Sequence, residues 1–206
     1  MSDAGATLRD AFGAIDIYLF DQLLKGRFHG RSTVLDAGCG GGRNLVFLLR
    51  HGFRVFGVDR SAEAVAAVRA LAAQLAPGLP PDHFRLSEVD ALPFGDASMD
   101  AVLSSAVLHF ARDEAHFHAM IDEMWRVLRP GGLLFARLAS SIGIEGAVRP
   151  LGGRSFILPD RSRRFLVDAE LLEATAARLG AELLDPIKTT IVHEQRAMTT
   201  WVVGKS

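Results

Sequence analysis

The feature that most constrains this chain is a glycine-dense turn near its start, Val34-Leu35-Asp36-Ala37-Gly38-Cys39-Gly40-Gly41-Gly42-Arg43-Asn44. A short apolar run enters the turn and the apolar segment 45–49 leaves it, so the pattern predicts a strand, a tight loop and a helix. Glycines at 38, 40 and 42 let backbone N–H groups and a helix N-terminus approach a ligand closely. The carboxylate of Asp36 favours a cationic group such as an ammonium or sulfonium over a pyrophosphate.

Length, charge and cysteine content narrow the class of protein. The chain has 206 residues, enough for one domain with its own core. No apolar run is long enough to span a bilayer, and Met1 to Asp10 are unlike a signal peptide. Cys39 is the single cysteine, which excludes an internal disulfide and fits a reducing cytosol. Lys and Arg number 23 against 24 Asp and Glu, which gives no global argument for nucleic acid or membrane. We therefore expect a cytoplasmic single domain over 1–206.

Apolar residues at three- and four-residue steps from Leu8 to Leu24 predict an amphipathic helix ahead of the first strand. We expect residues 1–30 to form an N-terminal helical cap. Residues 53–58 alternate like a strand and end at Asp59, roughly 20 positions past the glycine loop. A carboxylate at that strand tip is placed to accept hydrogen bonds from both ribose hydroxyls.

The rest of the chain continues to alternate strands and helices. The predicted helices are 62–75, 114–128 and 169–179, and the predicted strands are 83–86, 98–105, 133–138, 181–187, 189–193 and 198–203. The turn at 194–196 predicts an antiparallel hairpin. The expected fold is α/β: a Rossmann-like, doubly wound, seven-stranded sheet, mostly parallel, with an antiparallel C-terminal edge strand and helices on both faces.

Four segments occur in an order and spacing that resemble class I S-adenosylmethionine-dependent methyltransferases. They are the loop at 34–44, the acid at 59, the Asp-Ala-Leu-Pro-Phe run at 90–94 and Val-Leu-Arg-Pro-Gly-Gly-Leu-Leu at 127–134. The chain is similar to methyltransferases of types 11 and 12. The glycine loop ends in Gly42-Arg43-Asn44. This ending and the compact size of the chain resemble the small group of methyltransferases that includes tellurite-resistance-type enzymes.

The resemblance implies S-adenosylmethionine as cofactor, with S-adenosylhomocysteine as product. It implies that Asp90 accepts from the adenine amine, that the Ala91 N–H meets a ring nitrogen, and that the strand end at Ser105 lies beside the methionine ammonium. Arg60 is expected either along the adenine face or in solvent. The cofactor-binding residues expected in this way are Asp36, Gly38, Cys39, Gly40, Asn44, Asp59, Arg60, Asp90, Ala91 and Ser105.

Few catalytic side chains are needed, because a sulfonium is already a good methyl donor. If the acceptor carries a proton of high pKa, His109 or Tyr18 is the candidate general base. A packed or capping histidine and an aromatic ring packed on the sheet are the alternatives. His109, His116 and His118 do not predict a metal site, because positions two apart lie on different helix faces and no cysteine or acid cluster completes a ligand set.

A variable insert at 139–165 is rich in glycine and arginine. From Gly146 to Phe165 it has five arginines and one acid, Asp160. A solvated loop face is one interpretation, and a lid for an anionic substrate is the other, because arginine suits oxyanions. The arginines could also form a basic patch for RNA, but the insert lacks the interleaved aromatic residues that such a patch uses. The candidate substrate residues are Arg43, Arg137, Arg149 and Arg154.

The expected function is methyl transfer to a small-molecule acceptor, with an anionic one as the sharper hypothesis. An NAD-dependent oxidoreductase is an alternative that shares the glycine turn and Asp59. Against it, Arg43 stands where that fingerprint needs a small residue. A non-catalytic module that binds S-adenosylmethionine is a third alternative. The sequence encodes neither the acceptor nor the oligomeric state.

Overall fold

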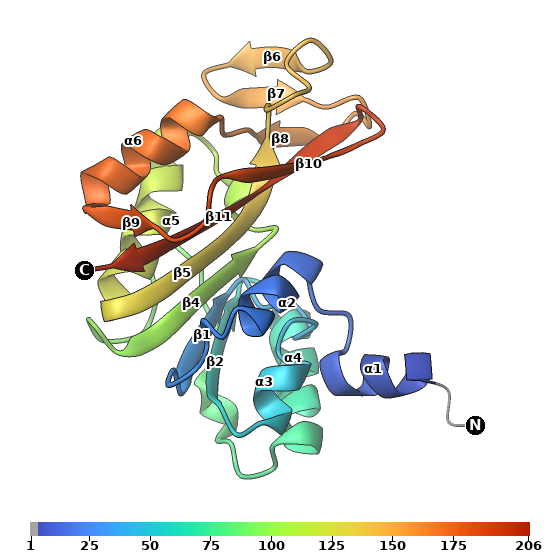
Figure 1. Ribbon diagram of the computed structural model, residues 1–206, viewed down its shortest axis with the longest axis vertical. Coiled ribbons are helices and arrows are strands. Elements are labelled where there is room, and N and C mark those ends of the chain that lie inside the picture. The colour runs from blue at the N-terminus through green and yellow to red at the C-terminus, as the bar shows by residue number, and fades with distance from the viewer. Residues whose placement is uncertain (1–3) are drawn as a thin grey trace.

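The computed structural model describes residues 4–206 as one large twisted sheet between two layers of helices, with a second small sheet above it (Figure 1). The helices are α1 (Ala4–Phe12), α2 (Ile17–Leu24), α3 (Val46–Arg50), α4 (Ala62–Leu75), α5 (Glu114–Val127) and α6 (Ala169–Leu179). Short 3₁₀ turns occur at Pro81–His83 and Leu108–Phe110. The strands are β1 (Thr33–Ala37), β2 (Arg54–Asp59), β3 (Phe84–Leu86), β4 (Met99–Ser105), β5 (Leu128–Ser140), β6 (Arg149–Gly152), β7 (Ser155–Ile157), β8 (Arg163–Phe165), β9 (Ala181–Leu183), β10 (Lys188–Val192) and β11 (Arg196–Lys205).

The large sheet has the strand order β10-β11-β5-β4-β1-β2-β3. Strands β3, β2, β1, β4 and β5 are parallel, and β11 runs antiparallel to both β5 and β10. This confirms the predicted fold class and the predicted hairpin at 194–196. The sheet has eight strands where seven were expected, because the short strand β9, which lies within the strand predicted at 181–187, also pairs with β11.

The core lies on both faces of the sheet. Every residue of β1 is buried, as expected for a central parallel strand. Val34 packs on one face with side chains from α2, α3 and α4. Its neighbour Leu35 packs on the opposite face with side chains from α5 and α6. Because successive strand residues point to opposite faces, two adjacent apolar residues anchor two separate helix layers.

The N-terminal segment differs from the single helix expected over 8–24. It forms two helices that are separated at Gly13, where φ is +66°. A Cβ at Gly13 would lie 2.7 Å from a methyl carbon of Val46, so glycine is needed there for space as well as conformation. Asp16 then caps α2 by accepting a hydrogen bond from the Tyr18 N–H at 3.0 Å. The expected cap over 1–30 can be followed from residue 4, since residues 1–3 lie outside the described range.

The insert at 139–165 is folded and is not a plain loop, although its strand β6 is exposed throughout. Strands β6, β7 and β8 form an antiparallel three-stranded sheet above the end of β5 (Figure 1). Arg154 anchors this small sheet to the main body, donating to Asp168 at 2.7 Å and to Glu114 at 3.2 Å. Among residues 4–206, no helix is long and apolar enough to cross a membrane.

Candidate functional site

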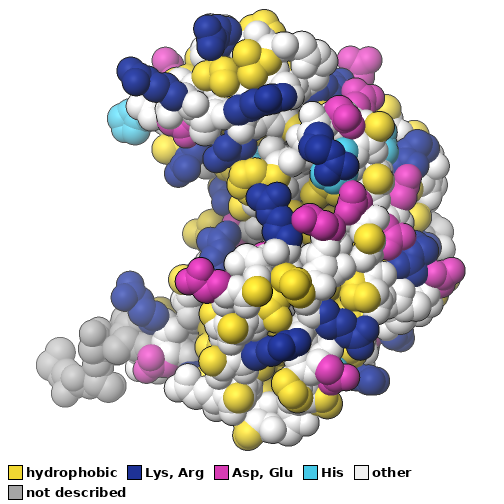
Figure 2. All heavy atoms as spheres, turned by 180° about the vertical axis from the view of Figure 1, so that it is seen from behind, with side chains coloured by type: hydrophobic (Ala, Val, Ile, Leu, Met, Phe, Trp, Pro, Cys, Tyr) yellow, Lys and Arg dark blue, Asp and Glu magenta, His cyan; other side chains and the backbone are white. Residues whose placement is uncertain are grey.

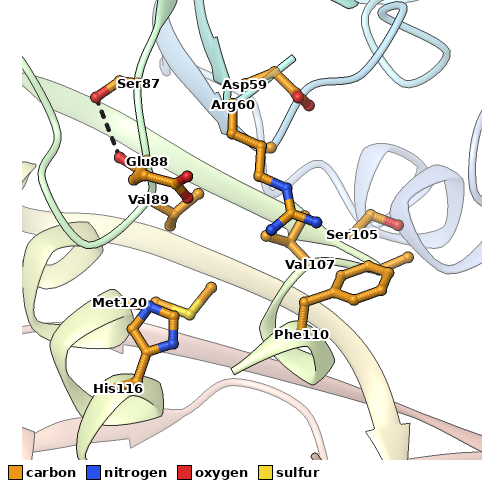
Figure 3. Close-up of a pocket in the computed structure, with 12 residues that line it drawn as sticks. Asp59, Arg60, Ser87, Glu88, Val89, Ser105, Val107, Phe110, His116 and Met120 are labelled. Atoms are coloured by element: carbon orange, nitrogen blue, oxygen red, sulfur yellow. Dashed lines mark hydrogen bonds between the residues drawn. The ribbon is translucent and has the colours of Figure 1, made fainter. Parts of the chain in front are cut away.

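A pocket lies at the carboxyl ends of β1, β2 and β4, where the direction of strand succession reverses in the sheet. Ligands of open α/β sheets bind at such a reversal, because the loops diverge there and leave a crevice. Figure 3 shows Arg60 and Glu88 directed into this space from opposite sides. We call it the Asp59 pocket, and it is lined by Gly38, Asp59, Arg60, Ser87, Glu88, Val89, Ser105, Ala106, Val107, Phe110, His116 and Met120.

The glycine loop forms one wall of the Asp59 pocket and is fixed to the end of β2. Gly38 has φ +87°, and a Cβ there would lie 2.3 Å from a methyl carbon of Val107. Only glycine fits both the conformation and the approach. The N–H groups of Gly38 and Cys39 both donate to the carbonyl of Val58 at 2.9 Å. These bonds hold the loop against the strand that carries Asp59.

Asp59 links the glycine loop to the helix that follows β2. Its Oδ2 accepts from the Gly40 N–H at 2.9 Å, and its Oδ1 accepts from the Ser61 N–H at 2.9 Å. Each carboxylate oxygen has a second lone pair, so the side chain can still accept two hydrogen bonds from a ligand in the pocket. Beside it, the Arg60 guanidinium lies 5.8 Å from the centre of the Phe110 ring (Figure 3).

Asp36 is a buried carboxyl group at the end of β1. Its Oδ1 has no hydrogen-bond partner among the described residues. Burial raises the pKa of this carboxyl to about 7, although the nearby charge of Arg43 opposes the shift. A buried, unpartnered acid of this kind is electrostatically suited to a cationic ligand group.

The turn after β3 presents different residues from those expected. Asp90 does not border the Asp59 pocket; its Oδ2 lies 3.1 Å from His116 Nε2 and 3.9 Å from Arg112. The Ala91 N–H donates to the Glu88 carbonyl at 3.4 Å instead of facing the pocket. Glu88 and Val89 line the pocket in their place. Sequence analysis missed both, because the turn geometry and not the local pattern decides which carboxylate faces inward.

On the other side of the glycine loop a second hollow is lined by Gly38, Cys39, Gly40, Gly41, Arg43, Asn44, Ser105 and Ala106. The Cys39 side chain belongs to the buried core, and burial raises the pKa of its thiol. Only the backbone of Cys39 is therefore suited to contact a ligand. Ser105, at the end of β4, borders both this hollow and the Asp59 pocket.

Asp16 is buried beside this second hollow and was missed in the sequence. Its Oδ2 accepts from Arg137 Nη1 at 3.0 Å and from Ser105 Oγ at 3.3 Å. Its backbone N–H donates to Asn44 Oδ1 at 2.9 Å. The apolar spacing placed Asp16 inside a single helix over 8–24, so the sequence indicated neither its role as a helix cap nor these partners.

Comparisons with known proteins agree with this geometry. Residues 35–136 match the methyltransferase domain family. A malonyl-acyl-carrier-protein O-methyltransferase from Serratia marcescens is 32% identical over 145 residues, which are 69% of this chain and 51% of that protein. The chain belongs to the class I S-adenosylmethionine-dependent methyltransferases. It spans about half the length of the curated relatives it matches.

Two solved structures share the fold of this chain. The PH0226 protein from Pyrococcus horikoshii OT3 has a TM-score of 0.72 at 18% identity, covering 100% of both chains. A 1,6-didemethyltoxoflavin-N1-methyltransferase from Burkholderia thailandensis, solved with 1,6-didemethyltoxoflavin and S-adenosylhomocysteine, has a TM-score of 0.68 at 22% identity. That likeness covers 98% of this chain and 83% of the other. The family membership does not support the oxidoreductase alternative.

The two candidate bases, Tyr18 and His109, lie apart from the Asp59 pocket. The Tyr18 hydroxyl is hydrogen-bonded to the Thr190 hydroxyl, and the ring lies 4.8 Å from the Arg137 guanidinium. His109 is buried, and its Nδ1 accepts from the Ala139 N–H at 3.3 Å. Burial, with help from the charge of Arg164, lowers the pKa of His109 to about 4. Neither residue borders the Asp59 pocket in the described part of the chain.

Of the four candidate substrate arginines, Arg43 and Arg137 converge on Asp16 Oδ2, at 3.8 Å and 3.0 Å, and the other two lie elsewhere. Arg43 donates to Ser105 Oγ at 3.2 Å, and Arg137 holds Asp16. Arg149 is exposed on β6, and Arg154 is engaged by two carboxylates as a structural anchor. Between residues 4 and 206, no group of three or more His, Cys, Asp or Glu side chains could hold a metal ion.

Proposed function

We propose that this protein transfers a methyl group from S-adenosylmethionine to a small-molecule acceptor by in-line displacement and releases S-adenosylhomocysteine. The observation that carries the proposal is the Asp59 carboxylate, bonded to the Gly40 N–H and bordering a pocket at the reversal point of the sheet. Hydrogen-bond acceptors at that strand tip suit the two hydroxyls of a ribose. Family membership independently supports methyl transfer.

The adenine end of the cofactor is assigned to the turn after β3. Glu88 points into the pocket and can accept a hydrogen bond from an exocyclic amine (Figure 3). Val89, Val107 and Met120 supply apolar walls for a ring. We assign this role to Glu88 and Val89 in place of Asp90 and Ala91, because the latter pair is directed elsewhere.

The methionine end is assigned to the glycine loop. The unpartnered Oδ1 of Asp36 fits an ammonium group, which would neutralise a carboxylate that is otherwise isolated in the core. Gly38 and Gly40, both at positive φ, leave the loop without side chains toward the ligand. Ser105 lies between the two hollows and is suited to the same end of the cofactor.

Methyl transfer from a sulfonium requires few catalytic side chains. When bound, S-adenosylmethionine supplies a methyl group on a positively charged sulfur. The role of the protein is to hold the acceptor atom in line with that methyl carbon, at ~3–3.5 Å, and such alignment contributes several kcal/mol. His109, neutral at physiological pH and bonded at Nδ1, is poorly suited as a general base. We therefore propose an acceptor that reacts without a base from His109.

Calorimetric titration with S-adenosylmethionine, S-adenosylhomocysteine and NAD, each separately, tests the proposal. We expect micromolar binding of both adenosyl ligands and no binding of NAD. Methyl-labelled S-adenosylmethionine should then label a member of a small-molecule acceptor panel. Tight NAD binding without adenosyl binding would overturn the assignment. Adenosyl binding with no labelling of any acceptor would favour the non-catalytic binding module.

A further inference from the structure

A third pocket, lined by His109, Phe110, Ala111, Arg112, Ser155, Arg163, Arg164 and Phe165, lies where the small sheet meets the 3₁₀ turn after β4. We call it the arginine pocket. Its polar side chains are donors or hydroxyls, and no carboxylate lines it. Building on the proposed function, we propose that the arginine pocket binds the oxyanion group of the methyl acceptor, which is a small organic acid or phosphate ester with an apolar body.

The charges of the pocket are only partly compensated. Among the described residues, Arg163 and Arg164 have no carboxylate within 4.0 Å, whereas Arg154 in the same insert contacts two. Arg164 donates to the Arg163 carbonyl at 2.7 Å, and Arg163 donates to Ser155 Oγ at 3.5 Å. Arg112 has one distant partner, Asp90 at 3.9 Å. Two guanidinium groups that line one pocket without an acid partner favour an oxyanion there.

Asp160 is close enough to Arg164 to be affected by its charge. The pKa of Asp160 lies below its usual range, first because Ser162 donates hydrogen bonds to it and also because Arg164 and Arg196 are nearby. Asp160 lines a different hollow, next to Val192 and Arg196. It therefore does not occupy the arginine pocket.

His109 also lines the arginine pocket and can add a hydrogen-bond donor to it. Because its Nδ1 accepts from the Ala139 N–H, the ring proton of the neutral imidazole is on Nε2. With its pKa lowered to about 4, the ring is uncharged at neutral pH. The buried Nε2–H can thus donate to an oxyanion without carrying charge. Phe110 and Phe165 provide apolar surface around it.

Phe110 connects this pocket to the proposed methyl-transfer site, since it borders both the arginine pocket and the Asp59 pocket. Its ring has the Arg164 guanidinium at 4.9 Å and the Arg60 guanidinium at 5.8 Å. Figure 2 shows a deep hollow on one face of the molecule with Lys and Arg side chains along its walls. An acceptor anchored by its oxyanion in the arginine pocket can extend past Phe110 toward the methyl group.

The test uses three phenyl probes: benzoate, the neutral benzamide that matches benzoate in shape, and phenyl phosphate. Each is titrated calorimetrically into the full chain saturated with S-adenosylhomocysteine. The variants are Arg164→Gln, Arg163→Gln/Arg164→Gln, and Arg161→Gln as the control that removes an exposed charge from the same insert. We expect at least one of the two anions to bind the wild type and Arg161→Gln equally. We expect roughly tenfold or greater weakening in the double variant.

Affinity for S-adenosylhomocysteine should remain unchanged in all variants, which also shows that they fold. The comparison of benzoate with phenyl phosphate identifies which oxyanion the pocket prefers. Equal anion binding by the wild type and the double variant, or benzamide binding as tight as that of the anions, would overturn the arginine pocket assignment. Failure of the wild type to bind S-adenosylhomocysteine would instead overturn the proposed function. In that case the anion titration is repeated without S-adenosylhomocysteine. The difference in anion affinity between the wild type and the variants then decides whether the arginine pocket binds an oxyanion.

Discussion

Asp16 and Arg137 are separated by 121 positions in the chain, yet Asp16 Oδ2 lies 3.0 Å from Arg137 Nη1. Asp16 is 4% exposed, so this ion pair is largely withdrawn from water. It ties the N-terminal helices to β5, and Ser105 Oγ donates to the same carboxylate oxygen. The N-terminal cap is thereby fixed beside the end of the strand that borders the proposed cofactor site.

Asp16→Asn should loosen this cap. Asparagine can still cap α2, but it loses the charge-assisted bond to Arg137 and leaves that guanidinium unpaired. We expect the free energy of unfolding to fall by about 2 kcal/mol. Amide hydrogen exchange over residues 4–24 should accelerate. Asp21→Asn is the control, because its pairing with Lys25 is exposed and should change stability by less than ~0.5 kcal/mol. Unchanged exchange in Asp16→Asn would contradict the assignment.

Asp59→Asn should weaken binding of S-adenosylhomocysteine by roughly 10- to 100-fold, because hydrogen bonds that involve a charged partner contribute ~1.5–3 kcal/mol. Asparagine preserves the shape of the side chain and one acceptor toward Gly40. Calorimetric titration measures the change, with the exposed Asp82→Asn as the matched control. An equal affinity in wild type and Asp59→Asn would show that this carboxylate does not contact the ligand.

Two single substitutions can distinguish the roles of Glu88 and Asp90 in cofactor binding. Glu88→Gln should weaken S-adenosylhomocysteine binding about tenfold, because the carboxylate that borders the pocket becomes an amide. Asp90→Asn should change this affinity much less, since Asp90 contacts His116 and not the pocket. The reverse ranking would restore the original assignment to Asp90.

Asp36 should give the ligand-free protein a distinctive pH dependence. Its pKa rises from 3.8 to about 7 on folding, mainly because of burial. Between pH ~4 and 7 the folded state retains a proton that the unfolded chain has released. The free energy of unfolding from this group therefore falls as the pH rises through that window, by up to ~1.4 kcal/mol per pH unit.

The variant Asp36→Asn removes this titration. Relative to wild type it should be more stable at pH 8, with little or no gain at pH 4, as measured by thermal unfolding. It should also bind S-adenosylmethionine more weakly, because the proposed partner of the ammonium is lost. If the difference in stability between wild type and Asp36→Asn does not change between pH 4 and 8, the pKa of Asp36 is not raised on folding.

Much of the fold was predictable because its causes are local. The helices over 62–75 and 169–179 have the predicted bounds, since a side-chain cap begins each one and the chain breaks shortly after. The N-terminal break at Gly13 was missed because apolar spacing continues across it. The small sheet of β6–β8 was missed because its strands have three or four residues each, too short to show a period.

The sequence by itself determined the strand-loop-helix unit around Gly38, the alternation of strands and helices along the chain and the place of Asp59 at a strand tip. These follow from backbone conformation and side-chain period, which neighbouring residues fix. Only the tertiary structure decided that Glu88 faces the pocket and Asp90 turns to His116, that Asp16 holds Arg137, and that His109 lies with Arg164. Such contacts join segments far apart in the chain, and their geometry depends on how whole elements pack.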